Sequence, residues 1–424
     1  MSKKNDLEHT STTLGSQNMK SSQRMVSIVE PYELPEGWKW CRLPECVSIV
    51  TGKKDANYGT PDGKYLFFTC AEQPLRCDDY SFEGESLLLP GNGANVGQVI
   101  YYDGQFEVYQ RTYVLQKTNE SILLKYLYYH ILGFWKNYNL DKQYGSATNY
   151  IKMGNFLNYH FPLPPTLAEQ QRIVNRIESM FAKLDEAKEK AQNVVDGFET
   201  RKAAILHKAF TGELTAKWRK ENGLSDDSWV EKTIGEIASK ITDGEHSTPK
   251  RVDQFCGYYL LSARNIHNGE IRLDDVDFVT ENEYERIRKR CNPNKNDILI
   301  SCSGSIGRVC VIQDNNKYVM VRSAAMVKLL QDNPFYIAYM LQSFNVQQQI
   351  EKTKKQSCQA NLFLGAIKQL SLPVPTLPEQ QEIVRILDII IEKERIAKQA
   401  AEAVLEQIDL LKKSILARAF RGEL

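Results

Sequence analysis

The sequence lacks any apolar run of about 18 residues, the length that a membrane-spanning helix needs. Its first residues, MSKKNDLEHTSTTLGSQNMKSSQ, lack the apolar segment of a secretory signal. The nine cysteines, which lie between Cys41 and Cys358, include no Cys-x-x-Cys pair. That spacing argues against a disulfide framework and against a zinc site. We therefore expect a cytoplasmic protein with reduced thiols and no membrane partner.

An excess of charge of either sign is also missing. Lys and Arg number 54 and Asp and Glu 53, so the net charge is +1. This balance gives no long-range attraction to nucleic acid or to anionic lipid, and any such affinity must come from local patches. The 424 residues, 42% of them hydrophobic, suffice for two or three domains with cores of their own. Residues 1–30 are polar and poor in large apolar side chains, which predicts a disordered tail.

Catalytic motifs are absent as well. The sequence contains no P-loop lysine motif, no His-Glu-x-x-His and no nucleophile elbow. The six histidines never stand at metal-ligand spacing from carboxylates. We therefore predict that the chain itself holds no metal and no cofactor and catalyses no reaction.

Two short stretches are similar to cofactor or methylation motifs. The stretch GNGANVG, residues 91–97, would have to begin a helix in order to hold a phosphate. The following residues 99–102, VIYY, favour a strand instead, so we predict a glycine turn between strands. Asn333-Pro334-Phe335 is similar to the adenine-methylation motif N-P-P-[FY] but lacks the second proline. We interpret it as the start of a helix.

What the sequence does contain is a long internal repeat. Residues 165–214 align without a gap to residues 375–424, and 21 of the 50 positions are identical. At the same offset Gly97 falls on Gly307, and Arg111 matches Arg322 one residue later. Each half of the chain is therefore a variable block followed by a more constant one.

Each constant block reads as one long helix. Thr166 with Glu169, and Thr376 with Glu379, form the Thr-x-x-Glu pattern of a helix N-terminus, in which hydroxyl and carboxylate satisfy opposite free amides. Gly212 and Gly422 stand where a left-handed C-terminal cap is expected. About forty helical residues would make a rod of about 60 Å.

Apolar residues recur along both constant blocks in steps of four and three. In the frame that begins at Ile173, nine of ten positions are apolar and the exception is Arg201; in the frame that begins at Ile383, the exception is Glu394. Such a stripe must be covered, and we predict an antiparallel intramolecular coiled coil of the two helices. Pairing with a second copy of the chain is the alternative. We further predict that Arg201 and Glu394 approach one another and fix the register.

The variable blocks, residues 31–164 and 229–374, predict α+β domains. Strands are indicated at residues 65–69, 97–102, 297–301 and 308–312, and helices near 125–138 and 334–351. Proline-rich segments end both blocks just before the long helices. Residues 215–228 link the first constant block to the second variable block.

Polar loops carry the remaining chemistry. The first block has TGKKDANYG (residues 51–59), and the second has TDGEHSTPKR (residues 242–251) and a basic cluster of Arg286, Arg288, Lys289, Arg290 and Lys295. Lys and Arg neutralise phosphates, and Asn and Arg form paired hydrogen bonds with purine edges. These loops suit DNA. The competing interpretation is a solvated loop or, for the basic cluster, the exposed end of a helix.

Together with the repeat, these residues resemble the specificity subunit of type I restriction-modification enzymes. The resemblance covers the chain after the tail. It rests on LPEGWKW (residues 34–40), DGEHSTP (243–249), NDILISCSGSIGR (296–308), and two P-T-L-x-E-Q-Q helices that end in F-x-G-E-L.

The resemblance implies two target-recognition domains, each reading one half of a split, asymmetric site in double-stranded DNA. It also implies that two methyltransferase subunits, which carry S-adenosylmethionine, dock on this chain, and that motor-nuclease subunits join them. By resemblance and loop chemistry together, the predicted DNA contacts are Lys53, Lys54, Asn57, Tyr58, Ser146, Asn149, His246, Ser247, Lys250, Arg251, Arg264, Ser357 and Asn361.

Two details depart from this pattern. The loop TGKKDANYG differs from DGEHSTP, which argues against equivalence of the two loops. The match of Arg111 with Arg322 across the repeat favours a structural role for both. The alternatives for the whole chain are the recognition subunit of another multisubunit methylating nuclease, a non-catalytic coiled-coil assembly protein and, least supported, a stand-alone methyltransferase.

Overall fold

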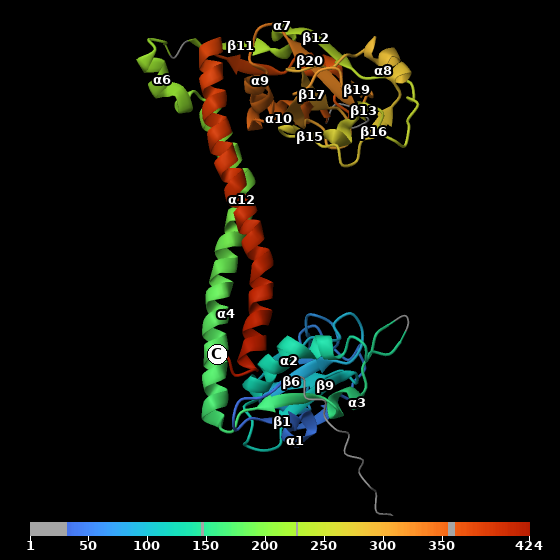
Figure 1. The fold of residues 1–424 in the computed structure, drawn as a ribbon, viewed down its shortest axis with the longest axis vertical. Helices are drawn as coiled ribbons and strands as arrows, with labels where there is room; N and C mark the ends of the chain where they lie inside the picture. Colours follow the sequence, from blue (N-terminus) through green and yellow to red (C-terminus); the bar gives the residue numbers. More distant parts are fainter. Residues whose placement is uncertain (1–31, 146–147, 226–227, 355–360) are drawn as a thin grey trace, which may run out of the picture. The chain divides into compact units, whose positions relative to one another are not determined.

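The computed structural model (Figure 1) describes residues 32–145, 148–225, 228–354 and 361–424, so the predicted tail lies outside the described residues. The chain divides into two compact units. The first unit consists of the described residues of Met1–Lys183 together with Leu410–Leu424, and the second unit is Leu184–Asp409. Each unit therefore combines one variable block with parts of both constant blocks.

The first unit is built on two small sheets and a strand pair. One antiparallel sheet has the order β2 (Val47–Thr51), β9 (Thr112–Lys117), β6 (Ser86–Pro90), β7 (Ile100–Tyr102). The other has the order β4 (Leu75–Cys77), β3 (Tyr65–Phe68), β8 (Gln105–Val108), β5 (Phe82–Glu83). The pair that closes the variable block is β1 (Lys39–Arg42) with β10 (His160–Leu163).

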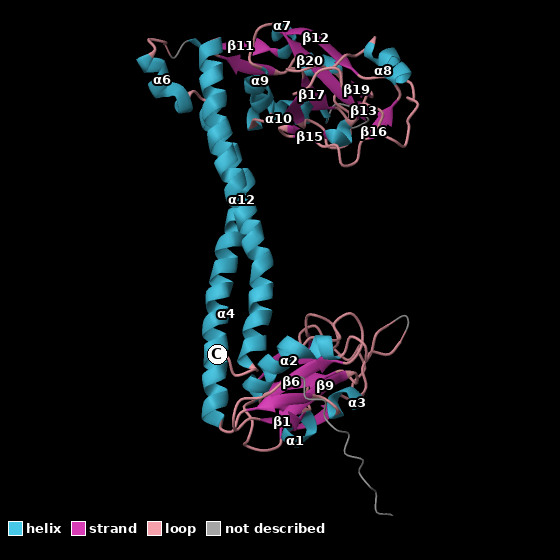
Figure 2. Ribbon diagram, viewed as in Figure 1, coloured by secondary structure: helices cyan, strands magenta, loops and turns pink. Residues whose placement is uncertain are grey.

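The second unit repeats this plan. Its antiparallel sheet has the order β12 (Ala238–Asp243), β20 (Ala324–Leu329), β17 (Ile298–Ser301), β18 (Val309–Val311). Its second sheet has the order β16 (Asp277–Val279), β13 (Tyr258–Leu261), β19 (Tyr318–Met320), and the strands are magenta in Figure 2. The closing pair is β11 (Val230–Thr233) with β21 (Ser371–Val374). A short hairpin joins β14 (Ile266–His267) to β15 (Glu270–Ile271).

The registers of the two units correspond. Thr51 lies opposite Tyr113 in the first unit, and Asp243 opposite Ala325 in the second. Strand β3 runs parallel to β8, as β13 does to β19. The duplication therefore extends through the variable blocks, where the sequence shows it only in fragments.

Most of the predicted elements are confirmed. Strands β3, β7, β17 and β18 lie where the sequence indicates them, and residues 91–97 form the predicted turn between β6 and β7. In the first unit the predicted helix is α2 (Leu124–Tyr138), and a short helix α3 (Met153–Leu157) follows it.

In the second unit one predicted helix is two. These are α9 (Pro334–Leu341) and α10 (Phe344–Lys354), which precede the short α11 (Leu364–Lys368). The predicted helix start at Asn333 is confirmed, because its side chain accepts a hydrogen bond from the amide of Phe335 at 2.9 Å.

The core of each unit joins its variable block to both long helices. In the first unit, Trp135 and Phe161 share a buried cluster with Ile173 from the first constant block and Phe420 from the second. In the second unit, Ile337 of α9 is buried with Phe210 and Leu387 in the same way. Each variable block is thus fixed to the ends of the helices by burial of apolar side chains.

The first constant block is interrupted, contrary to the prediction of one helix. It consists of α4 (Leu167–Asp196) and α5 (Phe198–Phe210), with Gly197 between them. Arg201 reaches back to donate to the carbonyl of Val194 at 2.9 Å, and a Cβ at Gly197 would lie 2.3 Å from the Arg201 guanidinium. Glycine therefore makes room for this side chain. The second constant block is one helix, α12 (Leu377–Ala419).

The glycine caps predicted at the C-terminal ends of the constant blocks are confirmed. The Thr-x-x-Glu pairing predicted at their N-terminal ends is not formed in full at either block. Gly212 and Gly422 both have positive φ, 77° and 75°, as a left-handed cap requires. Thr166 accepts from the amide of Glu169 at 3.2 Å, but the carboxylate of Glu169 binds Arg172 rather than the amide of Thr166. The acid of the second box, Glu379, also pairs elsewhere, with Arg219.

Contacts between the constant blocks occur within each unit. In the second unit Arg201 Nε lies 2.7 Å from Glu394 Oε2, and the ammonium of Lys398 lies 5.0 Å from the ring centre of Phe198. In the first unit the ammonium of Lys412 lies 5.0 Å from the ring centre of Phe181. No helix in the described part of the chain is both long enough and apolar enough for a bilayer.

Candidate nucleic-acid interface

Two loops leave the same place in the two units. Loop A is residues 52–59, which follow β2, and loop B is residues 244–251, which follow β12. A Cβ on Gly52 would lie 1.9 Å from the carbonyl oxygen of Val108, and one on Gly244 would lie 2.1 Å from that of Met320. Both glycines therefore press against the last residue of a strand, which is β8 in the first unit and β19 in the second.

The loops also pair with the chain in the same way. Lys54 forms a parallel bridge with Tyr109, and Glu245 forms one with Val321. Their sequence difference argued against equivalence, and that inference is wrong. The backbone fixes both loops by glycine packing and strand pairing, which leave the other side chains free to differ.

Loop A is held by one tyrosine. The hydroxyl of Tyr58 donates to Asp79 at 2.5 Å, and the ammonium of Lys54 lies 3.8 Å from the Tyr58 ring centre and 3.6 Å from Asp79. The Tyr58 hydroxyl and the Asp79 carboxylate raise the pKa of Lys54. Lys53 and Asn57 are exposed. The structure thus brings four predicted residues into one loop, with Lys54 the cation already paired.

Loop B is held by carboxylates. Asp243 accepts from His246 at 2.7 Å and from Arg290 at 2.7 Å, and Arg290 also donates to the carbonyl of Gly244 at 3.0 Å. Burial raises the pKa of Asp243, but the hydrogen bonds from His246 and Arg290 outweigh it, so this pKa lies below its ordinary value. His246 therefore contacts the ion pair of Asp243 and Arg290, and Asp243 is the last residue of β12.

A second chain of contacts runs through the rest of loop B. Ser247 donates to Glu245 at 2.6 Å, Arg286 contacts both Glu245 at 3.4 Å and Glu283 at 2.9 Å, and Glu283 accepts from the amide of Lys250 at 3.0 Å. The Ser247 hydroxyl and amide, together with Arg286, lower the pKa of Glu245. Two of the predicted contacts, Ser247 and Lys250, are therefore joined by residues of α8 (Glu281–Arg288).

Arg251 and Arg264 share one acid. Arg251 Nε lies 2.8 Å from Asp277 Oδ2, and Arg264 Nη2 lies 3.1 Å from Asp277 Oδ1. Burial raises the pKa of Asp277, but the two guanidinium groups outweigh it and hold this pKa below its ordinary value. The sequence indicated both arginines and gave no sign of Asp277, since the Arg251 and Asp277 positions are 26 residues apart.

The basic cluster is largely neutralised by its own neighbours. Arg286 pairs with Glu283, Arg288 with Glu285 at 3.1 Å, and Arg290 with Asp243. Helix α8 ends within this cluster, as the competing interpretation has it. Arg290 was predicted as part of this basic cluster, but its contact with Asp243 was not, because the two residues are 47 positions apart.

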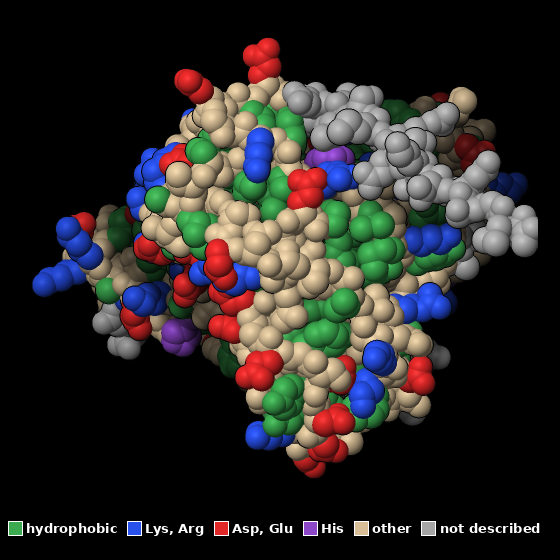
Figure 3. All heavy atoms as spheres, turned by 90° about the horizontal axis from the view of Figure 1, so that it is seen from below, with side chains coloured by type: hydrophobic (Ala, Val, Ile, Leu, Met, Phe, Trp, Pro, Cys, Tyr) green, Lys and Arg blue, Asp and Glu red, His purple; other side chains and the backbone are tan. Residues whose placement is uncertain are grey.

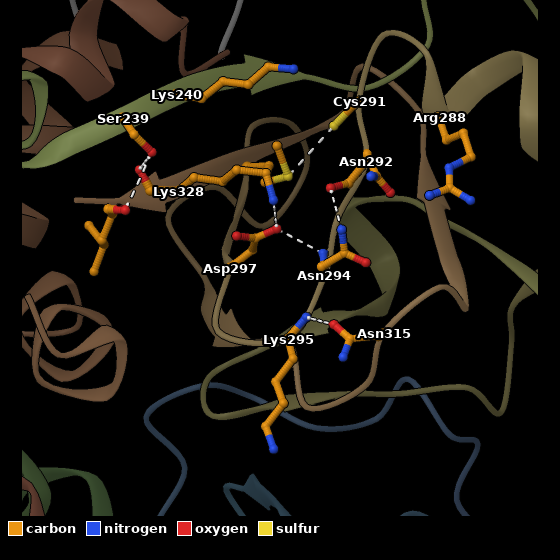
Figure 4. A network of polar contacts seen from close by, with 12 residues as sticks. Ser239, Lys240, Arg288, Cys291, Asn292, Asn294, Lys295, Asp297, Asn315 and Lys328 are labelled. Atoms are coloured by element: carbon orange, nitrogen blue, oxygen red, sulfur yellow. Dashed lines mark hydrogen bonds and ion pairs between the residues drawn. The ribbon is translucent and has the colours of Figure 1, made fainter. Parts of the chain in front are cut away.

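Figure 4 shows how the chain after α8 is anchored. Asp297 pairs with the Lys328 ammonium and accepts from the amide of Asn294 at 2.7 Å. The amide of Lys295 donates to Asn315 at 3.0 Å, while its side chain extends away from Asp297 and is exposed. Lys295 is thus a cation held on a fixed backbone.

Two of the remaining predicted contacts, Asn149 and Asn361, lie next to the turn before β7 and the turn before β18, respectively. In the first unit Asn149 is exposed and its carbonyl accepts from the amide of Gly93 at 2.9 Å. Asn361 is half-buried, and the amide of the next residue, Leu362, donates to Cys302 at 2.9 Å. Ser146 and Ser357 lie outside the described residues.

The two matched arginines are not equivalent in space. The amide of Arg322 donates to the carbonyl of Glu245, whereas in the first unit it is Gln110 whose amide donates to the carbonyl of Lys54. The offset between the units is 212 at β9 and β20 rather than the 211 that pairs Arg111 with Arg322. Both arginine side chains are exposed, and neither has a side-chain partner in the described part of the structure. Their match across the repeat is therefore wrong, and a structural role for them stays a prediction.

Charge of both signs is mixed on the surface. On the face drawn in Figure 3, Lys and Arg side chains are interspersed with Asp and Glu, and no broad area holds one sign alone. This distribution agrees with the net charge of +1. Affinity for an anionic partner must therefore come from particular loops.

Sequence comparison finds one family domain twice. The profile described as "Type I restriction modification DNA specificity domain" matches residues 35–195 and 226–407. The chain is 27% identical over 425 residues to the Type I restriction enzyme EcoDI specificity subunit of Escherichia coli, an alignment that covers 92% of this chain and 90% of that protein.

Solved structures share the fold. A chain in a structure concerned with complex assembly and conformational transition of the type I R-M system matches with a TM-score of 0.70 at 19% identity, over 93% of this chain and 100% of that one. The HsdS subunit from Thermoanaerobacter tengcongensis matches with a TM-score of 0.60 at 19% identity, over 93% and 99%.

Proposed function

Because the chain belongs to the family of type I restriction-modification DNA specificity proteins, we propose that it is the subunit that reads DNA for such a complex. Each variable block reads one half of a bipartite, asymmetric site in double-stranded DNA. The chain itself is not catalytic. S-adenosylmethionine belongs to two methyltransferase subunits that dock on it, and motor-nuclease subunits complete the assembly in the cytoplasm.

One observation carries this proposal. Loops A and B leave equivalent strands, and a buried glycine presses each against a backbone carbonyl, yet the loops present different side chains. A shared frame with different polar loops is what reading two unlike half-sites requires. Arg and Asn at such positions can form paired contacts with guanine and adenine worth about 1 to 3 kcal/mol each.

The carboxylates of loop B have a role in this proposal. An arginine held by an acid loses little side-chain freedom when it meets DNA, because its rotamer is already fixed. The acid also repels phosphate, so the loop has little affinity for DNA in general. Arg251 and Arg264, which share Asp277, are therefore proposed to contact base edges rather than the backbone.

The constant blocks are proposed to form an antiparallel intramolecular coiled coil. Contacts within each unit support this arrangement. Phe181 faces Lys412, Phe198 faces Lys398 and Arg201 faces Glu394. Residue numbers thus rise along the first constant block while those of the facing residues in the second block fall, as an antiparallel pair requires. Two related copies of the constant block offer similar surfaces to two copies of one methyltransferase subunit.

Methylation mapping tests the reading function. Methylated adenines are mapped in cells that carry the gene, in cells that lack it, and in cells with residues 245–251 of loop B replaced by those of a relative. We expect loss of the gene to remove methylation at one bipartite motif. The loop replacement should change one half of that motif and leave the other half unchanged. Unchanged methylation in all three strains contradicts the proposal.

Helix length should set the spacer between the half-sites. Seven residues inserted at facing positions of α4 and α12 add about 10 Å, or about three base pairs. We expect the spacer of the methylated motif to lengthen by that amount. Methylation at the original spacing would show that the helices do not act as a ruler.

The alternatives give different results in the test tube. A stand-alone methyltransferase would consume S-adenosylmethionine as the purified chain. A coiled-coil assembly protein would bind duplexes of any sequence equally. Another multisubunit methylating nuclease is distinguished by the subunits that copurify with the chain.

A further inference from the structure

A polar hollow opens in the second unit, outside loop B. It lies between residues 262–267 and the turn from β17 to β18, encloses about 550 Å³ and is open to solvent. Its lining includes Arg264, Arg308, His267, and the hydroxyls of Ser303, Ser305 and Ser323. Among the described residues that line it, the imidazole of His267 is the one aromatic ring, and no Phe, Tyr or Trp is present. The hollow thus offers mainly cations and hydroxyl donors, which suit a phosphate better than a stacked base.

Arg308 is the cation that distinguishes this hollow. Its amide donates to the hydroxyl of Ser301 at 2.9 Å, which fixes the backbone that carries it. Its guanidinium is half-buried and has neither an ion pair nor a hydrogen bond in the described part of the structure. Arg264, on the other side, is held by Asp277 at 3.1 Å and Asp275 at 3.6 Å. One positive charge in the hollow is therefore left without a counter-charge.

The equivalent turn of the first unit has a hydrogen-bonded glutamine in place of the arginine. Gln98 stands at the place of Arg308, since Gly97 and Gly307 occupy the same turn with φ of 104° and 84°. Its side chain donates to Asn95 at 3.0 Å, and Asn95 donates to the carbonyl of Cys70 at 2.9 Å. The first turn satisfies its own polar groups. The second turn carries an arginine that has no such partner.

We propose that this hollow binds a phosphate group of the DNA backbone beside the half-site that the second unit reads. The inference rests on the proposed function. The Arg308 guanidinium supplies two parallel N–H donors to the phosphate oxygens, and the hydroxyls of Ser303 and Ser305 add neutral donors. The contact positions the second unit on the duplex and carries no sequence information. The first unit has no such contact at its equivalent turn.

A salt titration of DNA binding tests the assignment. The full-length protein, its Arg308→Gln variant and its Arg395→Gln variant are titrated with several duplexes of unrelated sequence between 50 and about 300 mM NaCl. Arg308→Gln introduces the residue that the first unit has at this place. Arg395→Gln removes the same charge from α12, where Arg395 pairs with Glu392 at 2.6 Å. Circular dichroism checks that both variants are folded.

We expect Arg308→Gln to weaken all duplexes about equally, by roughly tenfold. The slope of log affinity against log salt should fall by about one, because one phosphate contact is lost. A Ser303→Ala, Ser305→Ala variant should weaken binding less and keep the slope. Equal slopes for Arg308→Gln and Arg395→Gln would overturn the proposal. A loss confined to one base pair of the motif would overturn it in favour of base reading.

A second arm separates the hollow from the function. Inorganic phosphate is titrated calorimetrically into the wild type and into Arg308→Gln, and also competed against bound duplex. Heat that disappears in the variant, with displacement of the duplex, supports a shared phosphate site. Phosphate binding without any affinity for duplexes contradicts the proposed function and leaves a site for free phosphate. Absence of a difference in both arms rejects the site.

Discussion

The two units hold equivalent loops by different means. Loop A is fixed by a tyrosine hydroxyl on Asp79, with one lysine stacked on the ring. Loop B is fixed by three acids, Asp243, Glu245 and Asp277, each bound to at least one guanidinium. The comparison shows that the frame requires only the glycine and the strand pairing. The side chains that stabilise each loop are free to change with the sequence that the loop reads.

The constant blocks differ in the same way although they are aligned copies of one another. Glu169 and Glu379 occupy the same position of the repeat. Glu169 forms a partly exposed pair with Arg172, whereas Glu379 is fully buried against Arg219 and Thr215. The difference arises after Gly212, where the chain continues into α6 (Ala216–Glu221), which carries Arg219. A conserved position can therefore have two energetic roles.

The largest effect should come from breaking this buried pair. Glu379→Ala removes the carboxylate that the buried Arg219 guanidinium contacts and should lower the free energy of unfolding by about 3 to 5 kcal/mol. Glu169→Ala removes a surface pair and should cost less than about 1 kcal/mol. Urea unfolding of both variants measures the difference. Similar losses would mean that the two positions are energetically alike.

The glycines of the two loops should be equally intolerant. Gly52→Ala and Gly244→Ala each place a methyl group within 2.1 Å or less of a backbone carbonyl. Each should cost about 1 to 3 kcal/mol through displacement of the loop. Gly365→Ala, where a Cβ would meet nothing within 4 Å, is the matched control. Thermal unfolding checks it, and tolerance at one of the two loop glycines would break the equivalence of the loops.

The pair of Arg201 and Glu394 should have a smaller effect. Arg201→Glu and Glu394→Arg each create a like-charge contact in a half-exposed place and should cost about 1 kcal/mol. The double exchange should restore most of it, because the pair is remade in the opposite sense. A double-mutant cycle of urea unfolding measures the coupling. Additive losses would show that the pair does not fix the register.

The smallest effect concerns the acid at the head of loop B. The pKa of Asp243 is lower in the folded protein than its ordinary value of 3.8, so its stabilising contribution is complete above that value. The contribution is lost as the pH falls through the lower, folded value. The stability lead of the wild type over Asp243→Asn should therefore shrink below about pH 4. The exposed Asp274→Asn variant should show no comparable change in urea midpoints.

The sequence predicted most of the fold because periodicity records it. The long helix α12, the glycine turn and the helix start at Asn333 all follow from local patterns that the structure retains. The break at Gly197 was not predicted. The correspondence of the variable blocks was harder to see, because the offset shifts from 192 at β2 and β12 to 212 at β9 and β20. That drift produced the false match of Arg111 with Arg322.

The candidate interface was predictable only as a list of donors. Loop residues such as His246 and Arg251 are recognisable by type and place. Their partners are not recognisable. Asp277, which binds Arg251, and Arg290, which binds Asp243, come from other elements far along the chain. Pairing across such distances is set by the sheet and by α8, and no local pattern records it. That these residues contact DNA stays a prediction.

The last helical turns of α12 have a consequence for biosynthesis. Leu416 and Phe420 are buried in the first unit, and the Phe420 ring lies 5.1 Å from that of Tyr126. A ribosome makes Tyr126 nearly three hundred residues before Phe420, so the interior of the nascent first unit stays incomplete until Phe420 has been made. Release of a shortened polypeptide would leave that interior open, and proteolysis would then remove unfinished copies preferentially.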